Sequence, residues 1–283
     1  MAKSILRAPK VIDFESDILK TCSLETESVL DSGICGDIIV VTHQGKPNWK
    51  LAIKTFSLTE EKRARSERSF DREARFMQSL DHKYIAKCFT AARCPEYLAI
   101  TMKYYQRRSL NFHVGSFSLE EAEVAIIQVG CALRYLHARN LVHLDVKLDN
   151  VFVDEACNAI LADFGLAMEV DPEKRSLQKK QIGGSPGYIA PECVRAAADA
   201  ELDPYKLDAF NLGVVFWALI FERAPGPNLN YYYETRKKRD LKENVRDLLL
   251  RLLRRDPAKR ASVADYLRRA RRDCVYRYFI DRH

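Results

Sequence analysis

The feature that most constrains this chain is a series of short polar motifs in a fixed order between apolar segments. Residues 143–150 read His-Leu-Asp-Val-Lys-Leu-Asp-Asn, and residues 163–165, thirteen positions after Asn150, read Asp-Phe-Gly. Residues 184–192 read Gly-Ser-Pro-Gly-Tyr-Ile-Ala-Pro-Glu. Upstream, a predicted turn contains Gly-Ile-Cys-Gly at 33–36, and a predicted strand contains Leu-Ala-Ile-Lys at 51–54. Each motif alone is weak evidence, but chance does not account for all five in this order.

The pattern of apolar residues predicts strands in the first part of the chain. The expected strands are residues 24–30, 37–42 and 49–56, with a polar turn at 43–48, followed after a helix by 85–91 and 97–102. The helix is expected over residues 59–80, beginning at Thr59, because Phe70, Ala74 and Met77 recur at helical spacing.

After residue 105 the pattern favours helices. Ser118 and Glu121 form a capping-box pair, which predicts the start of a long helix ending near His137. Short strands are expected at residues 141–142 and 151–153, and mostly helix from residue 204 onward, including a buried helix over 212–221. The sequence therefore predicts a small sheet-rich lobe followed by a larger helical lobe, with a connector near residues 103–108.

Together the five motifs resemble the signature set of the eukaryotic-type protein kinase family, over residues 24–267. The resemblance implies an α+β, bilobal protein-kinase-like fold with a small β-rich N-lobe and a larger helical C-lobe. It also implies an N-terminal extension at residues 1–20, an N-lobe at 21–103 and a C-lobe at 104–283, which form one catalytic domain. The implied activity is ATP-dependent phosphorylation of protein substrates, with ATP and Mg²⁺ as cofactors.

Phosphoryl transfer requires neutralised phosphate oxygens and a hydroxyl held in line with them. Carboxylate and amide oxygens suit Mg²⁺, and Asn150 and Asp163 are the implied metal ligands. Asp145 is placed to orient the attacking hydroxyl and accept its proton. Lys147 would reach the transferring phosphate. On the upstream strand, Lys54 would bridge the α- and β-phosphates.

The resemblance also implies that a glutamate on the following helix holds Lys54. Glu73 is the candidate, and the other acids of that helix are expected on its solvated side: Glu60, Glu61, Glu67 and Asp71. The remaining nucleotide-binding residues implied are Leu30, Gly33, Gly36, Ile38, Ala52, Met102, Lys103, Tyr104 and Phe152. An ordinary hydrophobic core would use the same residue types at Ile38, Ala52, Met102 and Phe152, so those four add little evidence.

Three positions depart from the usual kinase pattern. Asp31 replaces the first glycine of the phosphate-binding loop. Leu144 replaces the arginine that usually precedes the catalytic aspartate and binds a phosphorylated activation loop, and Gln181 stands where related kinases carry the phosphorylated threonine. The joint absence leads to the hypothesis of a kinase without phosphate control of its activation loop. The basic residues at 174–175 and 179–180 are candidates for holding that loop instead.

The loop containing Lys147 and the later Ser185 resemble Ser/Thr kinases rather than tyrosine kinases. Asp149 matches a position that meets a substrate arginine in some basophilic kinases. Glu192 and Arg260 match a structural ion pair of the family, and Asp208 matches a buried acid that holds the catalytic-loop backbone. The main alternative is a pseudokinase, a binding scaffold without turnover. Loss of Lys54, Asp145, Asn150 or Asp163 would favour it, and all four are present.

Composition narrows the remaining classes. No apolar run reaches the roughly 18 residues of a membrane span, and the N-terminus lacks the apolar core of a secretory signal. The expected location is therefore the cytoplasm, with the nucleus as an alternative. The eight cysteines show no zinc-ligand spacing and are expected to be reduced.

The net charge of +7 is a property of the C-terminal part of the chain. Residues 236–283 contain 17 Lys/Arg and 7 Asp/Glu, a net charge of +10, so residues 1–235 carry −3. This basic region is either a solvated helical face or a surface for acidic proteins, nucleic acid or anionic lipid, and Tyr276, Tyr278 and Phe279 are the aromatic residues interleaved with it. The expected partners are ATP and a protein substrate with a Ser/Thr acceptor, while the oligomeric state and the substrate sequence are not indicated.

Overall fold

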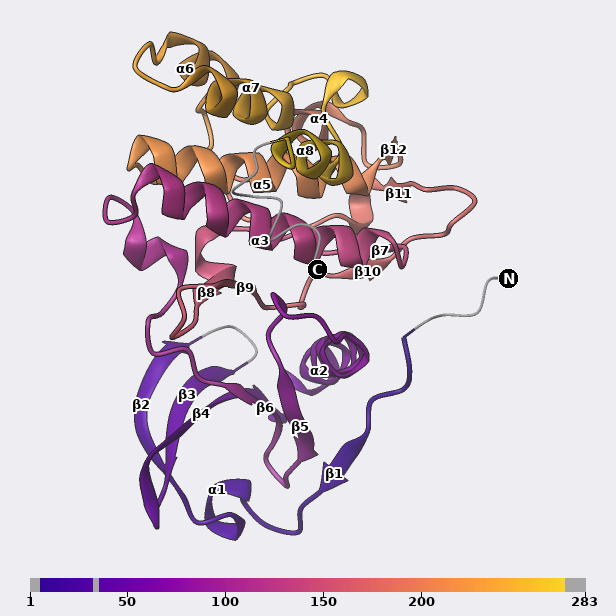
Figure 1. Ribbon diagram of the computed structural model, residues 1–283. Helices are drawn as coiled ribbons and strands as arrows, with labels where there is room; N and C mark the ends of the chain where they lie inside the picture. Colours follow the sequence, from indigo (N-terminus) through magenta and orange to yellow (C-terminus); the bar gives the residue numbers. More distant parts are fainter. Residues whose placement is uncertain (1–5, 33–35, 273–283) are drawn as a thin grey trace. The chain divides into compact units, whose positions relative to one another are not determined.

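The computed structural model describes residues 6–32 and 36–272. These residues form two compact units. The N-terminal unit contains described residues up to 81 together with 86–105, and the C-terminal unit contains 82–85 and 106–272. The first is rich in strands and the second in helices (Figure 1), which confirms the predicted α+β class with a small β-rich lobe and a larger helical lobe.

The N-terminal unit is built on one six-stranded sheet with strand order β1-β5-β6-β4-β3-β2. Its strands are β1 (Val11–Asp13), β2 (Leu24–Ser32), β3 (Asp37–His43), β4 (Lys46–Ser57), β5 (Cys88–Arg93) and β6 (Tyr97–Lys103). The meander β2-β3-β4 is confirmed, and its second turn is tighter than predicted because His43 pairs directly with Lys46. The following strand starts at Cys88 rather than at residue 85, since Ile85 belongs to the other unit and bridges to Leu161.

Two helices accompany the sheet, α1 (Ile18–Thr21) and α2 (Arg63–Ser79), and α2 packs against β4, β5 and β6. The predicted apolar face of α2 is confirmed, since Phe70, Ala74 and Met77 are buried. The predicted start at Thr59 is wrong. The Thr59 carbonyl accepts backbone hydrogen bonds from residues 62 and 63, which closes a turn, and the helix begins only at Arg63.

Strand β1 lies within the segment assigned to an N-terminal extension. It pairs in parallel with β5, with Val11 opposite Ala91 and Asp13 opposite Arg93. Parallel pairing of two strands so far apart in sequence leaves no local signal, because no short turn connects them. The sheet therefore gains an edge strand of three residues, one half-buried and two exposed, that the apolar pattern did not predict.

The C-terminal unit contains most of the helices. They are η1 (Leu110–His113), α3 (Leu119–His137), η2 (Leu148–Asn150), η3 (Lys179–Gln181), α4 (Pro191–Arg195), α5 (Pro204–Phe221), α6 (Tyr231–Lys237), α7 (Glu243–Leu252), η4 (Pro257–Lys259) and α8 (Val263–Ala270). Three two-stranded sheets join β7 (Leu141–Val142) to β10 (Met168–Glu169), β8 (Val151–Val153) to β9 (Ala159–Leu161), and β11 (Leu177–Gln178) to β12 (Glu201–Leu202).

Helix α5 is the centre of this unit, and α3, α7 and α8 pack around it (Figure 1). Most of its residues are buried, as expected for the apolar segment 212–221. Gly213 permits the close approach of α7, because a Cβ there would lie 2.8 Å from the Cβ of Leu252. The capping box of α3 is confirmed: the Glu121 amide donates to Ser118 Oγ at 3.2 Å, and the Ser118 amide donates to Glu121 Oε2 at 2.8 Å.

Two expectations from composition can be compared with the described residues. No helix in the described part of the chain is both long and apolar enough to cross a bilayer. The six cysteines in this part, at positions 22, 88, 94, 131, 157 and 193, carry free thiols. Tyr276, Tyr278 and Phe279, the aromatic residues of the basic region, lie outside the described residues.

Candidate functional site

The loop that precedes β8 brings Asp145 and Lys147 together with Ser185 from a later segment. Ser185 Oγ donates to Asp145 Oδ1 at 2.8 Å, and Lys147 Nζ donates to Ser185 Oγ at 2.8 Å. Lys147 Nζ also lies 3.0 Å from Asp145 Oδ2. Asp145 is only 8% exposed, and Lys147 and Ser185 hold its carboxylate in place. A hydroxyl and an ammonium group thus face one carboxylate at hydrogen-bonding distance.

Asn150 completes this loop from its other end. Its Nδ2 donates to the backbone oxygen of Asp145 at 2.9 Å and to Asp145 Oδ2 at 3.0 Å. The amide nitrogen is therefore committed to the loop, and the carbonyl oxygen Oδ1 is the atom of this side chain that suits a cation.

Asp163 follows the partner strand of the same hairpin. Strands β8 and β9 pair Val151 with Leu161, and the amide of Ala162 donates to the oxygen of Asn150 at 2.9 Å. Asp163 follows Ala162 directly, so Asp163 and Asn150 lie at the same end of the β8–β9 hairpin. It has a left-handed backbone with φ of 61°, and its Oδ1 accepts from the Gly165 amide at 3.3 Å. The fold brings both sequence-predicted metal ligands to one place.

Asp208 of α5 holds the catalytic-loop backbone, which confirms the role expected for this residue. It is fully buried and accepts from the amides of His143 at 3.0 Å and Leu144 at 2.8 Å. Leu144 has φ of 65°, a conformation that costs a residue with a β-carbon about 1 kcal/mol or more. Charge-assisted bonds from both amides to one carboxylate stabilise that strained backbone.

The predicted ion pair between Glu192 and Arg260 is confirmed. Arg260 Nη1 and Nη2 donate to the two carboxylate oxygens of Glu192 at 2.6 and 2.8 Å. The Arg260 side chain has no exposed surface, and its remaining groups donate to the backbone oxygens of Arg254 and Lys206. This geometry ties α4 to the region around α8 with every nitrogen of the guanidinium paired.

In the N-terminal unit, Lys54 of β4 meets Glu73 of α2. Lys54 Nζ donates to Glu73 Oε2 at 2.7 Å and to Oε1 at 2.9 Å. Glu73 is 2% exposed, whereas Glu60, Glu61 and Asp71 are exposed and Glu67 is half-buried. Burial, with the charge of Glu73 as a second cause, raises the pKa of the neighbouring Cys88 thiol to about 11.

Four of the predicted nucleotide-binding residues share one face of the sheet. Ile38 is opposite Lys54, Ala52 is opposite Met102, and residues directly opposite in a sheet point the same way. Gly36, which precedes β3, lies very close to the backbone of Thr55: a Cβ at this position would lie 2.1 Å from the Thr55 backbone oxygen.

The other predicted nucleotide-binding residues are placed as follows. Leu30 lies at an irregularity of β2 and is 43% exposed. Lys103 ends β6, and Tyr104 follows it. Phe152 is the middle residue of β8 in the other unit, opposite Ile160. Gly33 lies outside the described residues.

Sequence reasoning missed three residues that organise the catalytic loop. Ser185 was interpreted as a sign of the substrate class and not as a contact of the catalytic loop, although its hydroxyl contacts both Asp145 and Lys147. The Tyr188 hydroxyl accepts from the Leu148 amide at 3.2 Å, and burial raises the pKa of this phenol. Asn211 Nδ2 in turn donates to the backbone oxygen of Tyr188. Ser185 and Tyr188 lie within the motif at residues 184–192, and Asn211 lies three positions after Asp208 on α5.

A family profile described as the protein kinase domain matches residues 24–270. The chain belongs to the protein kinase domain family. The match covers most of both structural units and includes all of the motifs identified from the sequence.

Among its curated relatives, CBL-interacting protein kinase 25 of Oryza sativa is 27% identical over 77% of this chain and 45% of that protein. An Aurora kinase of Schizosaccharomyces pombe is 26% identical over 81% of this chain and 66% of that protein. RAC-beta serine/threonine-protein kinase B of Xenopus laevis is 29% identical over 66% of this chain and 40% of that protein. This kinase domain thus spans roughly half the length of the relatives it matches.

Proposed function

We propose that this kinase domain transfers the γ-phosphoryl group of Mg-ATP to Ser/Thr hydroxyls of protein substrates. The observation that carries the proposal is the cluster of Asp145, Lys147 and Ser185, in which a carboxylate already accepts a hydrogen bond from a serine hydroxyl beside an ammonium group. A substrate hydroxyl would be bound by the same carboxylate, with Lys147 supplying positive charge next to it.

The residues present fit a bound Mg-ATP. Asn150 offers an amide oxygen and Asp163 a carboxylate at the same end of the β8–β9 hairpin, which is the oxygen donor set that Mg²⁺ prefers. When bound, Mg-ATP supplies the phosphoryl group and a counter-charge for its oxygens. Asn150 and Asp163 would hold the metal, while Asp145 orients the acceptor hydroxyl and takes its proton.

Lys54 would bind the α- and β-phosphates, held in position by Glu73. The shared sheet face of Ile38, Ala52 and Met102 supports an adenine-binding role for these three residues. The remaining residues assigned to the nucleotide on the family pattern are Leu30, Gly33, Gly36, Lys103, Tyr104 and Phe152.

Activity without a phosphorylated activation segment is the second part of the proposal. The segment is anchored by pairing of β11 with β12 and by backbone bonds from residues 179 and 180 to 200 and 198, both at 2.9 Å. The Arg175 guanidinium stacks on the Tyr205 ring at 4.8 Å. Leu144 is buried, and the gap that it lines with Ile182 has a volume of only about 10 Å³, so little open space remains beside its side chain.

The location and further partners are also proposals. We propose a cytoplasmic or nuclear kinase, and acidic proteins as partners of the basic C-terminal region. Of that region, the structure describes residues up to 272.

The test of the proposed function is a peptide-array phosphorylation assay with purified protein and Mg-ATP. Asp145→Asn should abolish phosphate incorporation, because the carboxylate that accepts the proton is lost. Asp240→Asn, which removes the same charge at a side chain that is 76% exposed, is the matched control and should retain activity. A parent protein that incorporates no phosphate while it binds Mg-ATP would instead favour the scaffold alternative.

A further inference from the structure

The helix that carries Glu73 has a weakly stabilised beginning. Its N-cap residue, Lys62, makes no side-chain capping bond, and the first turn contains no acidic residue. Arg63 and Arg65 lie there instead, where the partial positive charge of the helix end disfavours cations. The position of α2 therefore depends on its buried face and on whatever holds its other end.

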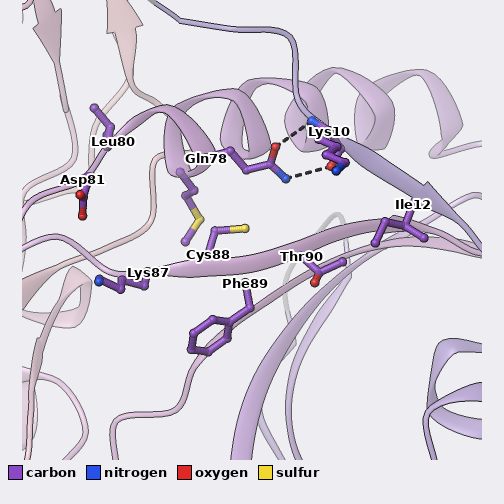
Figure 2. Close-up of a pocket in the computed structure, with 10 residues that line it drawn as sticks. Lys10, Ile12, Gln78, Leu80, Asp81, Lys87, Cys88, Phe89 and Thr90 are labelled. Carbon is purple, nitrogen blue, oxygen red and sulfur yellow. Dashed lines mark hydrogen bonds between the residues drawn. The ribbon is translucent and has the colours of Figure 1, made fainter.

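The segment formed by residues 6–14, here called the N-terminal strap, holds that other end. Gln78 makes two hydrogen bonds with one residue of the strap: the Lys10 amide donates to Gln78 Oε1 at 2.7 Å, and Gln78 Nε2 donates to the Lys10 oxygen at 3.0 Å (Figure 2). The Arg7 amide donates to Ser79 Oγ at 3.2 Å. The last turn of α2 is thus bound to the backbone of the strap.

The strap is itself fixed to the sheet. Strand β1 within it pairs with β5, and the Phe14 amide donates to the Arg93 oxygen at 2.9 Å. Phe14 packs against the buried cluster that includes Ile18 and Ile53. The strap therefore connects the end of α2 to the edge strand and to the core of the N-terminal unit.

Leu6 at the start of the strap is buried, but the contact near Lys10 and Ile12 is open rather than packed. A pocket of about 450 Å³, lined by Lys10, Ile12, Gln78, Cys88 and neighbouring side chains, lies among the strap, the end of α2 and β5 (Figure 2). Where such a space separates two elements, the hydrogen bonds across it determine how firmly they are joined. The Gln78 side chain bonds to both the backbone N–H and the backbone C=O of one strap residue, Lys10.

We infer that Gln78 is a positioning residue, which clamps α2 to the N-terminal strap and so keeps Glu73 against Lys54. Gln78 and Glu73 are five positions apart on one helix, about 7.5 Å along its axis. Movement of the last turn therefore shifts Glu73, because a helix moves as a stiff body over this length. The inference rests on the proposed function, in which the pair of Lys54 and Glu73 binds ATP phosphates.

The test compares Gln78→Met, which keeps the side-chain length and removes both hydrogen bonds, with Gln78→Glu, which keeps the acceptor and loses the donor. Gln44→Met is the matched control, because Gln44 makes an exposed bond to Glu25 at the β3–β4 turn. Two hydrogen bonds of ordinary strength predict about a fivefold rise in KM for ATP in Gln78→Met, a smaller rise in Gln78→Glu and no change in Gln44→Met. Amide hydrogen exchange in the last two turns of α2 should accelerate in the same order.

A double variant tests whether the effect passes through the strap. Lys10→Pro removes the amide that donates to Gln78, so Gln78→Met combined with Lys10→Pro should raise KM no further than Gln78→Met alone. Additive effects would overturn the inference, as would a Gln78→Met protein that melts at a lower temperature while its KM and helix exchange stay unchanged. If the parent protein fails to phosphorylate peptides, the proposed function alone is refuted. The hydrogen-exchange measurement still tests whether Gln78 holds the end of α2, because it does not depend on activity.

Discussion

The two units hold their functional side chains in different ways. In the C-terminal unit, Asp145 and Asn150 come from one loop, and the acid that holds its backbone, Asp208, is fully buried in the central helix. In the N-terminal unit, Lys54 and Glu73 come from a strand and a helix whose beginning lacks a side-chain cap. The first site is fixed by buried hydrogen bonds, and the second depends on how one helix is docked.

This difference indicates how easily the functional side chains of each unit can change position. Rearranging the catalytic loop would expose or unpair buried polar groups, which costs several kcal/mol. Moving α2 would break the ion pair between Lys54 and the buried Glu73, shift the buried apolar face of the helix, and break hydrogen bonds at exposed positions such as Gln78, so only part of its docking rests on buried polar contacts. The C-terminal unit is therefore expected to keep its geometry in most states of the protein, and the N-terminal unit to respond to changes at the end of α2.

The largest effect is expected from Arg260→Ala. Removing this arginine leaves the carboxylate of Glu192 without its partner in a nearly buried position, so unfolding free energy should fall by about 3–5 kcal/mol. Arg251→Ala is the matched control, because Arg251 is half exposed and pairs with Asp247 on the same helix, a contact worth less than about 1 kcal/mol. Urea unfolding of the two variants measures the difference, and equal midpoints would contradict the buried pairing.

The next effect is on catalysis in the N-terminal unit. Lys54→Met should lower kcat/KM at least about a hundredfold, because the charge that binds the ATP phosphates is lost. The buried Glu73 would also lose its partner, so stability should fall by about 1–3 kcal/mol, and adding Glu73→Gln should restore stability without restoring activity. Lys46→Met at the exposed start of the same strand serves as the control. Activity retained in Lys54→Met would refute the proposed kinase function.

The parts of the site that were predicted correctly had one of two signals. The contacts of Asp208, Glu192 and Arg260 were implied by the resemblance to the kinase family, and the capping box of α3 follows from two residues only three positions apart. The face of α2 that carries Glu73 follows from helical periodicity. Such features depend on local backbone geometry or on residue types that are rarely buried without a partner.

The parts that were missed involve residues far apart in sequence with ordinary side chains. Strand β1 pairs in parallel with a strand some 80 positions away, and Gln78 bonds to a backbone 68 positions away. The hydroxyl of Ser185 reaches Asp145 across 40 positions. Backbone groups such as those of Lys10 carry no residue signature, and a serine hydroxyl can bond to many kinds of partner, so the sequence pattern could not indicate which distant group Gln78 or Ser185 would meet. The start of α2 was wrong because Thr59 closes a turn with its carbonyl.

A smaller effect is expected on the reactivity of Cys88, which lies beside the end of α2. Because burial raises the pKa of Cys88 to about 11, its thiol stays protonated at pH 8, and alkylation should be at least about tenfold slower than at the exposed Cys22. The rate at Cys88 should keep rising as pH approaches 11. Because ionising Cys88 is less favourable in the folded protein than in the unfolded chain, stability should also fall as pH rises from 9.0, the ordinary thiol value, toward 11.

Iodoacetamide labelling followed by peptide mass spectrometry measures both rates, and labelling in urea provides the unfolded reference. Equal rates in the folded protein would contradict the enclosure of Cys88. Faster labelling of Cys88 in Gln78→Met, with Cys22 unchanged, would show that the clamp also limits access to the space beside α2.

The smallest expected effect concerns phosphate on the activation segment. Leu144 is 3% exposed and cannot pair with a phosphate, and Gln181 cannot carry one. The segment is anchored instead by β11–β12 pairing and by a hydrogen bond from Ser176 Oγ to Glu201 Oε2 at 2.7 Å. A phosphate on the segment would find no arginine at position 144 with which to form charge-assisted hydrogen bonds. Phosphatase treatment of bacterially made protein should therefore change turnover less than about twofold. Intact mass verifies that all phosphate has been removed.

Leu144→Arg sharpens this prediction. The substitution places a cation beside Asp145 in a gap of only about 10 Å³, so it should lower stability and activity rather than create phosphate control. A tenfold loss of turnover after phosphatase treatment, restored by autophosphorylation at Ser176 or Ser185, would show that phosphate control has moved to another residue. That result would also reverse the comparison between the units, because the C-terminal site would then depend on a modification while the N-terminal site depends on contacts within the chain.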